Sequence, residues 1–183
     1  RSHPNQMTKA FAHQLKSLKH DLTTPIVFDT SSPGTGKTYV AIKAFERRRK
    51  KKTGCALILA PKSLLRSTWA ADFKKFAPAL TVVVATADVR ESTFAEKADA
   101  YVTNIDAVKW LAKQPESFFA KFDTLIIDES SAYKHATSQR SKAAAKIAKY
   151  FKYKRAMTGT PNGRSITDVW HQVYLLDEGA RLG

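Results

Sequence analysis

The most informative stretch of the sequence is Ser31-Ser32-Pro33-Gly34-Thr35-Gly36-Lys37-Thr38, which follows an apolar run and opens a helix-compatible segment. Gly34 and Gly36 allow the backbone to turn its amides inward, and a helix that begins here directs the positive end of its dipole at the same space. Ser31 stands where many such loops have glycine, which loosens the match slightly. The strand-loop-helix setting nevertheless predicts a phosphate-binding loop in preference to a structural turn.

Side-chain chemistry assigns roles within this loop. Lys37 is expected to reach the β- and γ-phosphate oxygens of ATP, and the Thr38 hydroxyl is expected to ligate Mg²⁺. The backbone amides supply the other phosphate contacts. The predicted nucleotide-binding residues of the loop are therefore Ser32, Pro33, Gly34, Thr35, Gly36, Lys37 and Thr38.

Apolar runs and helical patterns alternate along the chain. Unalternating apolar runs predict strands at residues 26–28, 56–60, 81–85, 100–103, 125–127 and 155–157. Such runs are typical of parallel strands that are covered on both faces. Helical patterns lie between and after them, at residues 38–50, 63–76, 105–112, 138–150 and 165–176. The sequence therefore predicts one α/β domain over residues 1–183: an open parallel sheet with helices on both faces and ligands at the carboxyl ends of the strands.

Two carboxylates, Asp128 and Glu129, follow the predicted strand at residues 125–127. They are expected at the same edge of the sheet as the phosphate loop, because both follow the carboxyl end of a strand. Phosphoryl transfer to water needs one group for the metal's hydration shell and another to orient the attacking water. We therefore predict that Asp128 handles the metal and Glu129 the water, with Lys37 as the third catalytic residue, in preference to a helix N-terminal charge pair.

Charge is the abnormal bulk property of the chain. It has 31 Lys and Arg against 16 Asp and Glu, a formal net charge of +15. An excess of this size favours a polyanionic partner, DNA or RNA, over a role in solubility alone. No apolar run is long enough to span a bilayer, no apolar leader opens the sequence, and Cys55 is the single cysteine. We therefore expect no membrane association and a cytoplasmic location.

Six consecutive basic residues, at positions 47–52, close the helix that follows the phosphate loop. Cations at that position meet the negative end of the helix dipole. A helix that starts at the ligand edge of a sheet ends at the opposite edge, so the run is expected to face away from the nucleotide. This placement favours a solvated helix end over a direct nucleic-acid contact.

With these motifs in order, the chain resembles the first RecA-like lobe of the superfamily-two helicases, in particular the Swi/Snf-type DNA translocases and their phage-borne relatives. The segment 57–65 with Trp69 and Phe73 is similar to motif Ia, residues 102–104 to motif Ib, residues 128–131 to the DExx box and residues 158–161 to motif III. Segments 134–138, 168–170 and 175–177 also resemble this branch. Ser130 and Ser131 depart from its usual pattern but leave the catalytic pair intact.

The resemblance implies a RecA-like P-loop NTPase lobe that uses ATP and Mg²⁺. The implied partners are nucleic acid, in the form of double-stranded DNA, and a second RecA-like lobe in cis or in trans. A bacterial or phage-infected host cell is the implied setting. It nominates as nucleic-acid contacts Lys62, Ser63, Arg66, Thr103 and Asn104. It also implies that Thr158 and Thr160 couple the nucleotide to the nucleic acid, and it favours Gln6 over Gln14 as the adenine-reading glutamine.

Some alternatives remain open at this point. Ser63 is equally compatible with a helix N-cap. Trp69, Trp110 and Trp170 lie on helical patterns and are expected in the core or at a lobe interface.

The leading function is the ATPase lobe of a DNA translocase or helicase. Its rivals are a basic DNA-binding or regulatory module that binds ATP with little turnover, and a metabolic kinase, which motif III and the charge disfavour.

Overall fold

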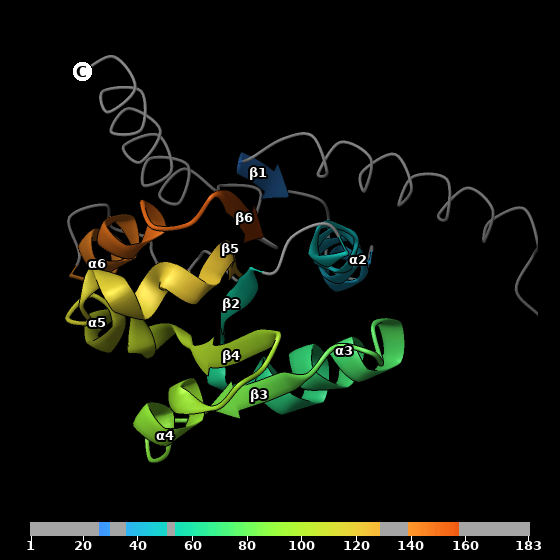
Figure 1. Ribbon diagram of the computed structural model, residues 1–183, viewed down its shortest axis with the longest axis horizontal. Helices are drawn as coiled ribbons and strands as arrows, with labels where there is room; N and C mark the ends of the chain where they lie inside the picture. Colours follow the sequence, from blue (N-terminus) through green and yellow to red (C-terminus); the bar gives the residue numbers. More distant parts are fainter. Residues whose placement is uncertain (1–25, 30–35, 51–53, 129–138, 158–183) are drawn as a thin grey trace, which may run out of the picture.

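The computed structural model describes residues 26–29, 36–50, 54–128 and 139–157, and these form one six-stranded parallel sheet (Figure 1). The order across the sheet is β1-β6-β5-β2-β4-β3. The strands are β1 (Ile26–Asp29), β2 (Cys55–Ala60), β3 (Val82–Ala85), β4 (Ala100–Asn104), β5 (Phe122–Ile127) and β6 (Tyr153–Met157). All six predicted strands are confirmed, as is the open α/β fold.

Helical segments connect the strands. They are α2 (Lys37–Arg49), the turn η1 (Lys62–Leu64), the π-helical η2 (Leu65–Ala70), α3 (Ala71–Phe76), α4 (Arg90–Ala95), η3 (Ile105–Ala107), α5 (Val108–Leu111), η4 (Glu116–Lys121) and α6 (Gln139–Ala148). Four of the predicted helices are confirmed, whereas α4 and η4 were not predicted because each is too short to show a helical period. The predicted helix at residues 165–176 lies outside the described residues.

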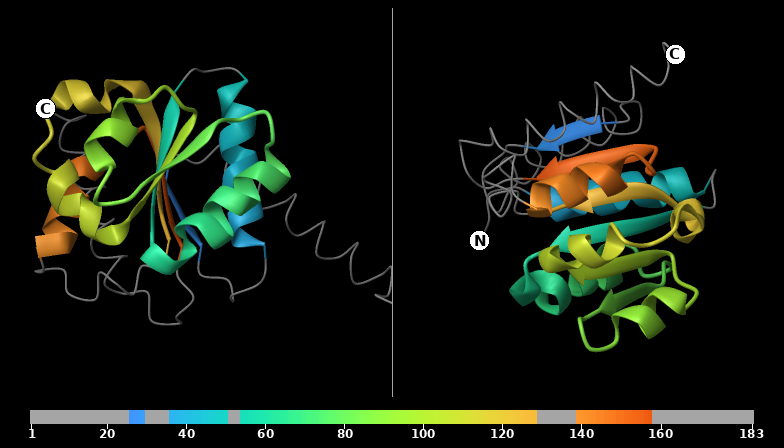
Figure 2. Two further views of the ribbon diagram at one scale, coloured as in Figure 1. Left: turned by 90° about the horizontal axis from the view of Figure 1, so that it is seen from below. Right: turned by 90° about the vertical axis from the view of Figure 1, so that its left-hand side faces the viewer.

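Helices cover both faces of the sheet. Viewed along the sheet, α2 and α3 lie on one side, and α4, α5 and α6 lie on the other (Figure 2). The first side holds a core that includes Phe45, Ile58 and Trp69, and the second holds a larger core that includes Leu57, Tyr101 and Phe122. Because successive residues of β2 alternate between the two cores, all six of its residues are buried. This double burial explains why the strand sequence is apolar without alternation.

The strand order places the predicted functional loops at one edge of the sheet. The parallel pairing aligns Leu59 of β2 with Ile127 of β5 and with Thr103 of β4. Asp128, which follows β5, donates its backbone N–H to the Leu59 carbonyl at 2.7 Å and so remains beside the end of β2. The start of α2 follows β1 at the same carboxyl edge. None of the helices in the described segments is long and apolar enough to cross a lipid bilayer.

Gly54, which precedes β2, lies against Asp123 of β5. A Cβ added at Gly54 would lie 2.1 Å from Asp123 Cγ and 2.6 Å from Asp123 Cβ, so the backbone itself would have to shift. We expect Gly54→Ala to lower the free energy of unfolding by about 1–3 kcal/mol, the usual cost of overpacking. Urea unfolding checks this. Adding Asp123→Ala removes the carboxylate contacts and should restore part of the loss, whereas a Gly54→Ala protein as stable as the parent would contradict the predicted clash.

Candidate nucleotide and nucleic-acid site

The helix α2 begins at a glycine in the left-handed region. Gly36 has φ 80° and ψ 29°, a conformation that residues with a Cβ rarely adopt, and its carbonyl accepts the N–H of Val40 at 3.1 Å. Lys37 is the first residue of the helix and is half-buried. The chain therefore turns directly from Gly36 into the helix, as a phosphate-binding loop requires. The loop residues Ser32, Pro33, Gly34 and Thr35 lie outside the described residues.

Thr38 is fixed by a carboxylate from the neighbouring helix. Its Oγ1 donates to Asp72 Oδ2 at 2.7 Å, across the contact between α2 and α3. Two further contacts hold these helices together: Lys43 Nζ donates to the Phe76 carbonyl at 2.6 Å, and the rings of Tyr39 and Phe76 meet edge to face at 5.0 Å. The Thr38 proton thus points at Asp72, which leaves the oxygen lone pairs available to a metal ion.

Asp128 is fixed by an indole from the same helical segment. Trp69 is fully buried, and its Nε1–H donates to Asp128 Oδ2 at 2.7 Å. Trp69 was predicted to be a core residue, and this is confirmed, but the sequence did not indicate its second role. The indole hydrogen bond engages one carboxylate oxygen and restricts the rotation of the side chain. A hydroxyl oxygen from Thr38 and a carboxylate from Asp128 are oxygen donors of the kind that Mg²⁺ prefers.

Two of the predicted nucleic-acid contacts are exposed cations near the end of β2. Lys62, Ser63 and Arg66 are all exposed, on the turn η1 and the π-helical η2. Ser63 is not an N-cap, since Pro61 and Leu64 occupy the two capping positions and neither helix start has a side-chain cap. The Thr86 hydroxyl, and to a lesser extent the charges of Lys62 and Arg66, lower the pKa of the exposed Asp88 carboxyl.

The other two predicted contacts differ from each other. Thr103 is fully buried, and its Oγ1 donates to the Ala85 carbonyl at 2.7 Å, so the prediction that this side chain contacts nucleic acid is wrong. The hydroxyl instead joins β4 to β3. Asn104 is half-buried, and its Oδ1 accepts from Arg90 Nη2 at 3.2 Å. Arg90 also lies over the Trp110 ring at 5.8 Å, and Trp110 packs on Phe94 as predicted for a core residue.

The basic run at the end of α2 lies at the opposite edge of the sheet, as predicted, but it is only partly solvated. Arg47 and Lys50 are exposed. Arg48, in contrast, lies 4.4 Å from the Tyr153 ring centroid, and burial lowers the pKa of its guanidinium while the Asp123 carboxylate opposes that shift. Arg49 pairs with Asp99 and donates to the Gly54 carbonyl at 2.7 Å. The prediction of a solvated helix end is therefore wrong for Arg48 and Arg49, which hold the helix to the sheet.

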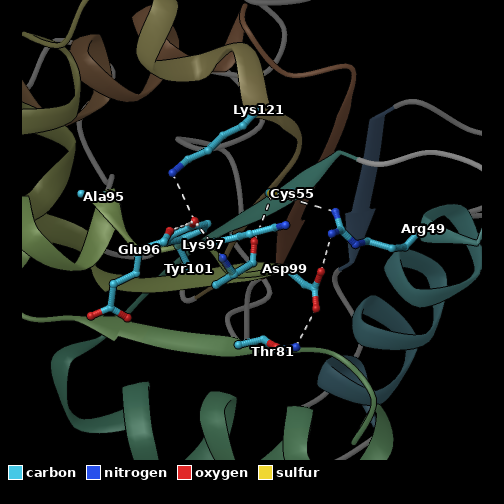
Figure 3. Close-up of a pocket in the computed structure, with 10 residues that line it drawn as sticks. Arg49, Cys55, Thr81, Ala95, Glu96, Lys97, Asp99, Tyr101 and Lys121 are labelled. Atoms are coloured by element: carbon cyan, nitrogen blue, oxygen red, sulfur yellow. Dashed lines mark hydrogen bonds and ion pairs between the residues drawn. The ribbon is translucent and has the colours of Figure 1, made fainter.

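Arg49 also lines a pocket of about 710 Å³ at this far edge (Figure 3). Its residues Thr81, Asp99 and Lys121 each precede a strand, which places the pocket at the amino ends of the strands. Three of its charged groups have partners within the protein: Asp99 accepts from Arg49 and from the Thr81 amide, and Lys121 donates to the Phe94 carbonyl at 2.6 Å. The Cys55 thiol, a core group as predicted, donates to the Ala98 carbonyl. The pocket lies far from the candidate nucleotide site.

The remaining predicted site residues, Gln6, Glu129, Thr158 and Thr160, lie outside the described residues, as do Gln14 and Trp170. Three residues that the sequence did not single out belong to the described site: Asp72, Asp88 and Arg90. Asp72 follows Trp69 by three positions and so shares its helix face, which was a usable signal. Nothing local in the sequence indicates that Arg90 meets Asn104, because the two residues come together only through the pairing of β3 with β4.

Comparison with known proteins gives consistent matches. A family model described as the SNF2-related domain matches residues 15–180. Protein p41 of Acyrthosiphon pisum secondary endosymbiont phage 1 is 29% identical over 162 residues, which cover 82% of this chain and 35% of the phage protein. An ATP-dependent helicase of Mycoplasma genitalium is 32% identical over 127 residues, which cover 63% of this chain and 11% of the helicase.

A solved structure, the Sulfolobus solfataricus SWI2/SNF2 ATPase core in complex with dsDNA, is similar to this chain in fold. The TM-score is 0.62 at 25% sequence identity, and the match covers 91% of this chain and 34% of that chain. The chain thus spans about a third of the length of the phage protein and of the Sulfolobus ATPase core.

Proposed function

The chain belongs to the SNF2-related domain family, and from this membership we propose that it is the ATP-binding and ATP-hydrolysing lobe of a DNA-dependent translocase or helicase. One structural observation supports the proposal independently of the family membership. Thr38 of α2 and Asp128 after β5 are both hydrogen-bonded to the segment formed by η2 and α3, and they lie at the carboxyl edge of the sheet. Two oxygen donors from distant parts of the sequence are thereby held by one short segment, at the edge where ligands of open α/β sheets bind.

In the proposed reaction, ATP is hydrolysed at this edge. The amides of residues 31–36 hold the β-phosphate, Lys37 neutralises β- and γ-phosphate oxygens, and Gln6 reads the adenine. Glu129 orients the attacking water and accepts its proton. Thr38 and Asp128 would hold Mg²⁺, which when bound supplies positive charge to the phosphate oxygens. Thr158 and Thr160 would couple nucleotide binding and hydrolysis to the nucleic-acid surface.

The proposed nucleic-acid surface consists of Lys62, Ser63, Arg66, Arg90 and Asn104, at the ends of β2, β3 and β4. Arg, Lys and short polar side chains are the usual contacts to backbone phosphates, and such contacts position a protein without reading sequence. Thr103 is left out because its hydroxyl is buried. Double-stranded DNA is the proposed partner, which rests on the likeness to the DNA-bound Sulfolobus ATPase core. Residues 1–183 would form one lobe that faces a second RecA-like lobe.

A pair of double variants with equal charge loss tests the proposed surface. We expect Lys62→Ala with Arg66→Ala to weaken duplex binding for every sequence and to reduce the slope of log K against log salt by about one unit per lost phosphate contact. The matched control, Arg47→Ala with Lys50→Ala, removes two exposed cations at the opposite edge. It should change long-range attraction only, because the Debye length is about 8 Å at physiological salt.

The measurement is a fluorescence-anisotropy titration of one labelled duplex at several salt concentrations. A larger loss of affinity and slope in the control than in the Lys62 and Arg66 variant would move the nucleic acid to the basic end of α2. Unfolding curves of both variants show whether either change disturbs the fold. Arg48 and Arg49 are unsuitable for this comparison because they pack against the protein.

A further inference from the structure

One short segment holds both side chains to which the proposed function assigns metal binding. Trp69, in η2, donates to Asp128, and Asp72, in α3, accepts from Thr38, each at 2.7 Å. Trp69 and Asp72 are three residues apart in a helical segment that continues from η2 into α3, so they lie on the same face. α3 and α2 lie on the same side of the sheet in Figure 1, which agrees with the direct contact between Asp72 and Thr38.

The two hydrogen bonds are of the kind that support a metal site. Ligand oxygens are normally oriented by a further layer of hydrogen bonds, and the loss of such a partner typically reduces metal affinity or activity 10–100-fold. Thr38 can offer its lone pairs to a cation only when its proton points elsewhere, and Asp72 accepts that proton. Trp69 has a single donor and no acceptor, so its indole engages one oxygen of Asp128, Oδ2, and holds the orientation of the carboxylate.

We propose that Trp69 and Asp72 are positioning residues for the Mg²⁺ bound with the nucleotide, acting through Asp128 and Thr38. This inference rests on the proposed function. The same segment contains Arg66 and directly follows the turn η1, which contains Lys62. Both cations belong to the proposed nucleic-acid surface, so a displacement of this segment would move the partners of both metal-binding side chains. η2 is π-helical, a rare form that occurs frequently at functional sites and interrupts the regular helix at this place.

The test measures ADP affinity by calorimetry in millimolar Mg²⁺ and again in EDTA. The variants are Trp69→Phe, which keeps an aromatic ring but removes the N–H, and Asp72→Ala, which removes the acceptor of the Thr38 proton. We expect each to weaken ADP binding about 10–100-fold in Mg²⁺ and to leave the affinity in EDTA unchanged. Asp72→Glu restores a carboxylate and should recover part of the loss. Matched controls are Trp110→Phe and Asp106→Ala, on the other face of the sheet.

Equal losses with and without Mg²⁺ would overturn the inference, because the residues would then act on the fold or on the nucleotide itself. Unchanged affinity in both conditions would overturn it as well. The proposed function fails separately: in that case the parent protein would show no Mg²⁺-dependent ADP binding, or Lys37→Ala would leave it intact.

A spectroscopic measurement keeps the test decisive if a variant folds poorly. The indole N–H of Trp69 in the ¹⁵N-labelled parent protein is identified by the signal lost in Trp69→Phe, or by its slow hydrogen exchange as the indole of a fully buried tryptophan. We expect this signal to shift when ADP and Mg²⁺ are added together and to stay in place when ADP is added in EDTA. A signal that is insensitive to Mg²⁺-ADP would overturn the role of Trp69.

Discussion

Lys37→Ala is expected to weaken Mg-ATP binding by about 2–5 kcal/mol, which is roughly thirty-fold to several thousand-fold in Kd. Lys37 is the first residue of α2, directly after the left-handed Gly36, at the end of the helix where the phosphate site is proposed. Removing it leaves the charge of the polyphosphate without its nearest cation. Isothermal calorimetry on the folded variant measures the change in affinity.

A matched control comes from the other end of the same helix. Lys50 is exposed and forms the C-cap of α2, so Lys50→Ala removes an equal charge without touching the proposed site. Its ATP affinity should remain within about two-fold of the parent, because exposed charges at that distance are screened. A folded Lys37→Ala protein that binds ATP as the parent does would exclude the phosphate-loop assignment.

The second large effect concerns turnover. We expect the 183 residues alone to hydrolyse ATP about 10³–10⁵ times more slowly than a two-lobe ATPase of this family bound to its nucleic acid. An arginine finger is worth that factor in phosphoryl transfer, and the resemblance implies that the second RecA-like lobe supplies it. Phosphate release with and without duplex DNA measures the rate. Glu129→Gln should lower the residual rate, which identifies that rate as a property of this site.

Turnover at tens per second from a protein shown by light scattering to be monomeric would contradict this expectation. Such a rate would mean that an arginine of this chain completes the site. Arg90 and Arg140 are at least partly exposed in the described residues, and alanine variants of each would then identify the source.

The fold could be predicted because each strand carries its own signal. β2, β4 and β5 lie in the interior of the sheet with helices on both sides, and double burial selects unbroken apolar runs such as residues 56–60. The start of α2 could also be predicted, because a glycine at position 36 can adopt the positive φ that this helix start has. Short elements such as α4 gave no signal, because six residues with two buried side chains do not establish a period.

The candidate site was only partly predictable. Gly36, Lys37, Thr38 and Asp128 carry chemistry that a local motif reveals, whereas the partners of these residues depend on which helix packs against which. Thr103 shows the limit most clearly: a threonine at the end of a strand is a common phosphate contact, yet the pleat turns this hydroxyl toward the Ala85 carbonyl. Arg48 and Arg49 show the same limit, since a basic run indicates charge but not what the charge contacts.

The position of β1 has a consequence for the order in which the protein is completed during synthesis. β1 is the first described strand in the chain, yet it lies at the end of the sheet and pairs with β6, the last described strand. β1 therefore leaves the ribosome well before the strand that pairs with it exists. Closing this long loop costs entropy before the contacts between β1 and β6 can compensate for it.

The proposed nucleotide-binding site should consequently be the last part of the lobe to form. A nascent chain that ends before β6 can pair β2 with β4 and β5, and β3 with β4, but it has no strand to seat β1. A ligand that binds only the completed arrangement stabilises it by mass action. Cellular ATP would therefore favour the final docking step, so that the molecule the protein is proposed to consume also helps to complete its folding.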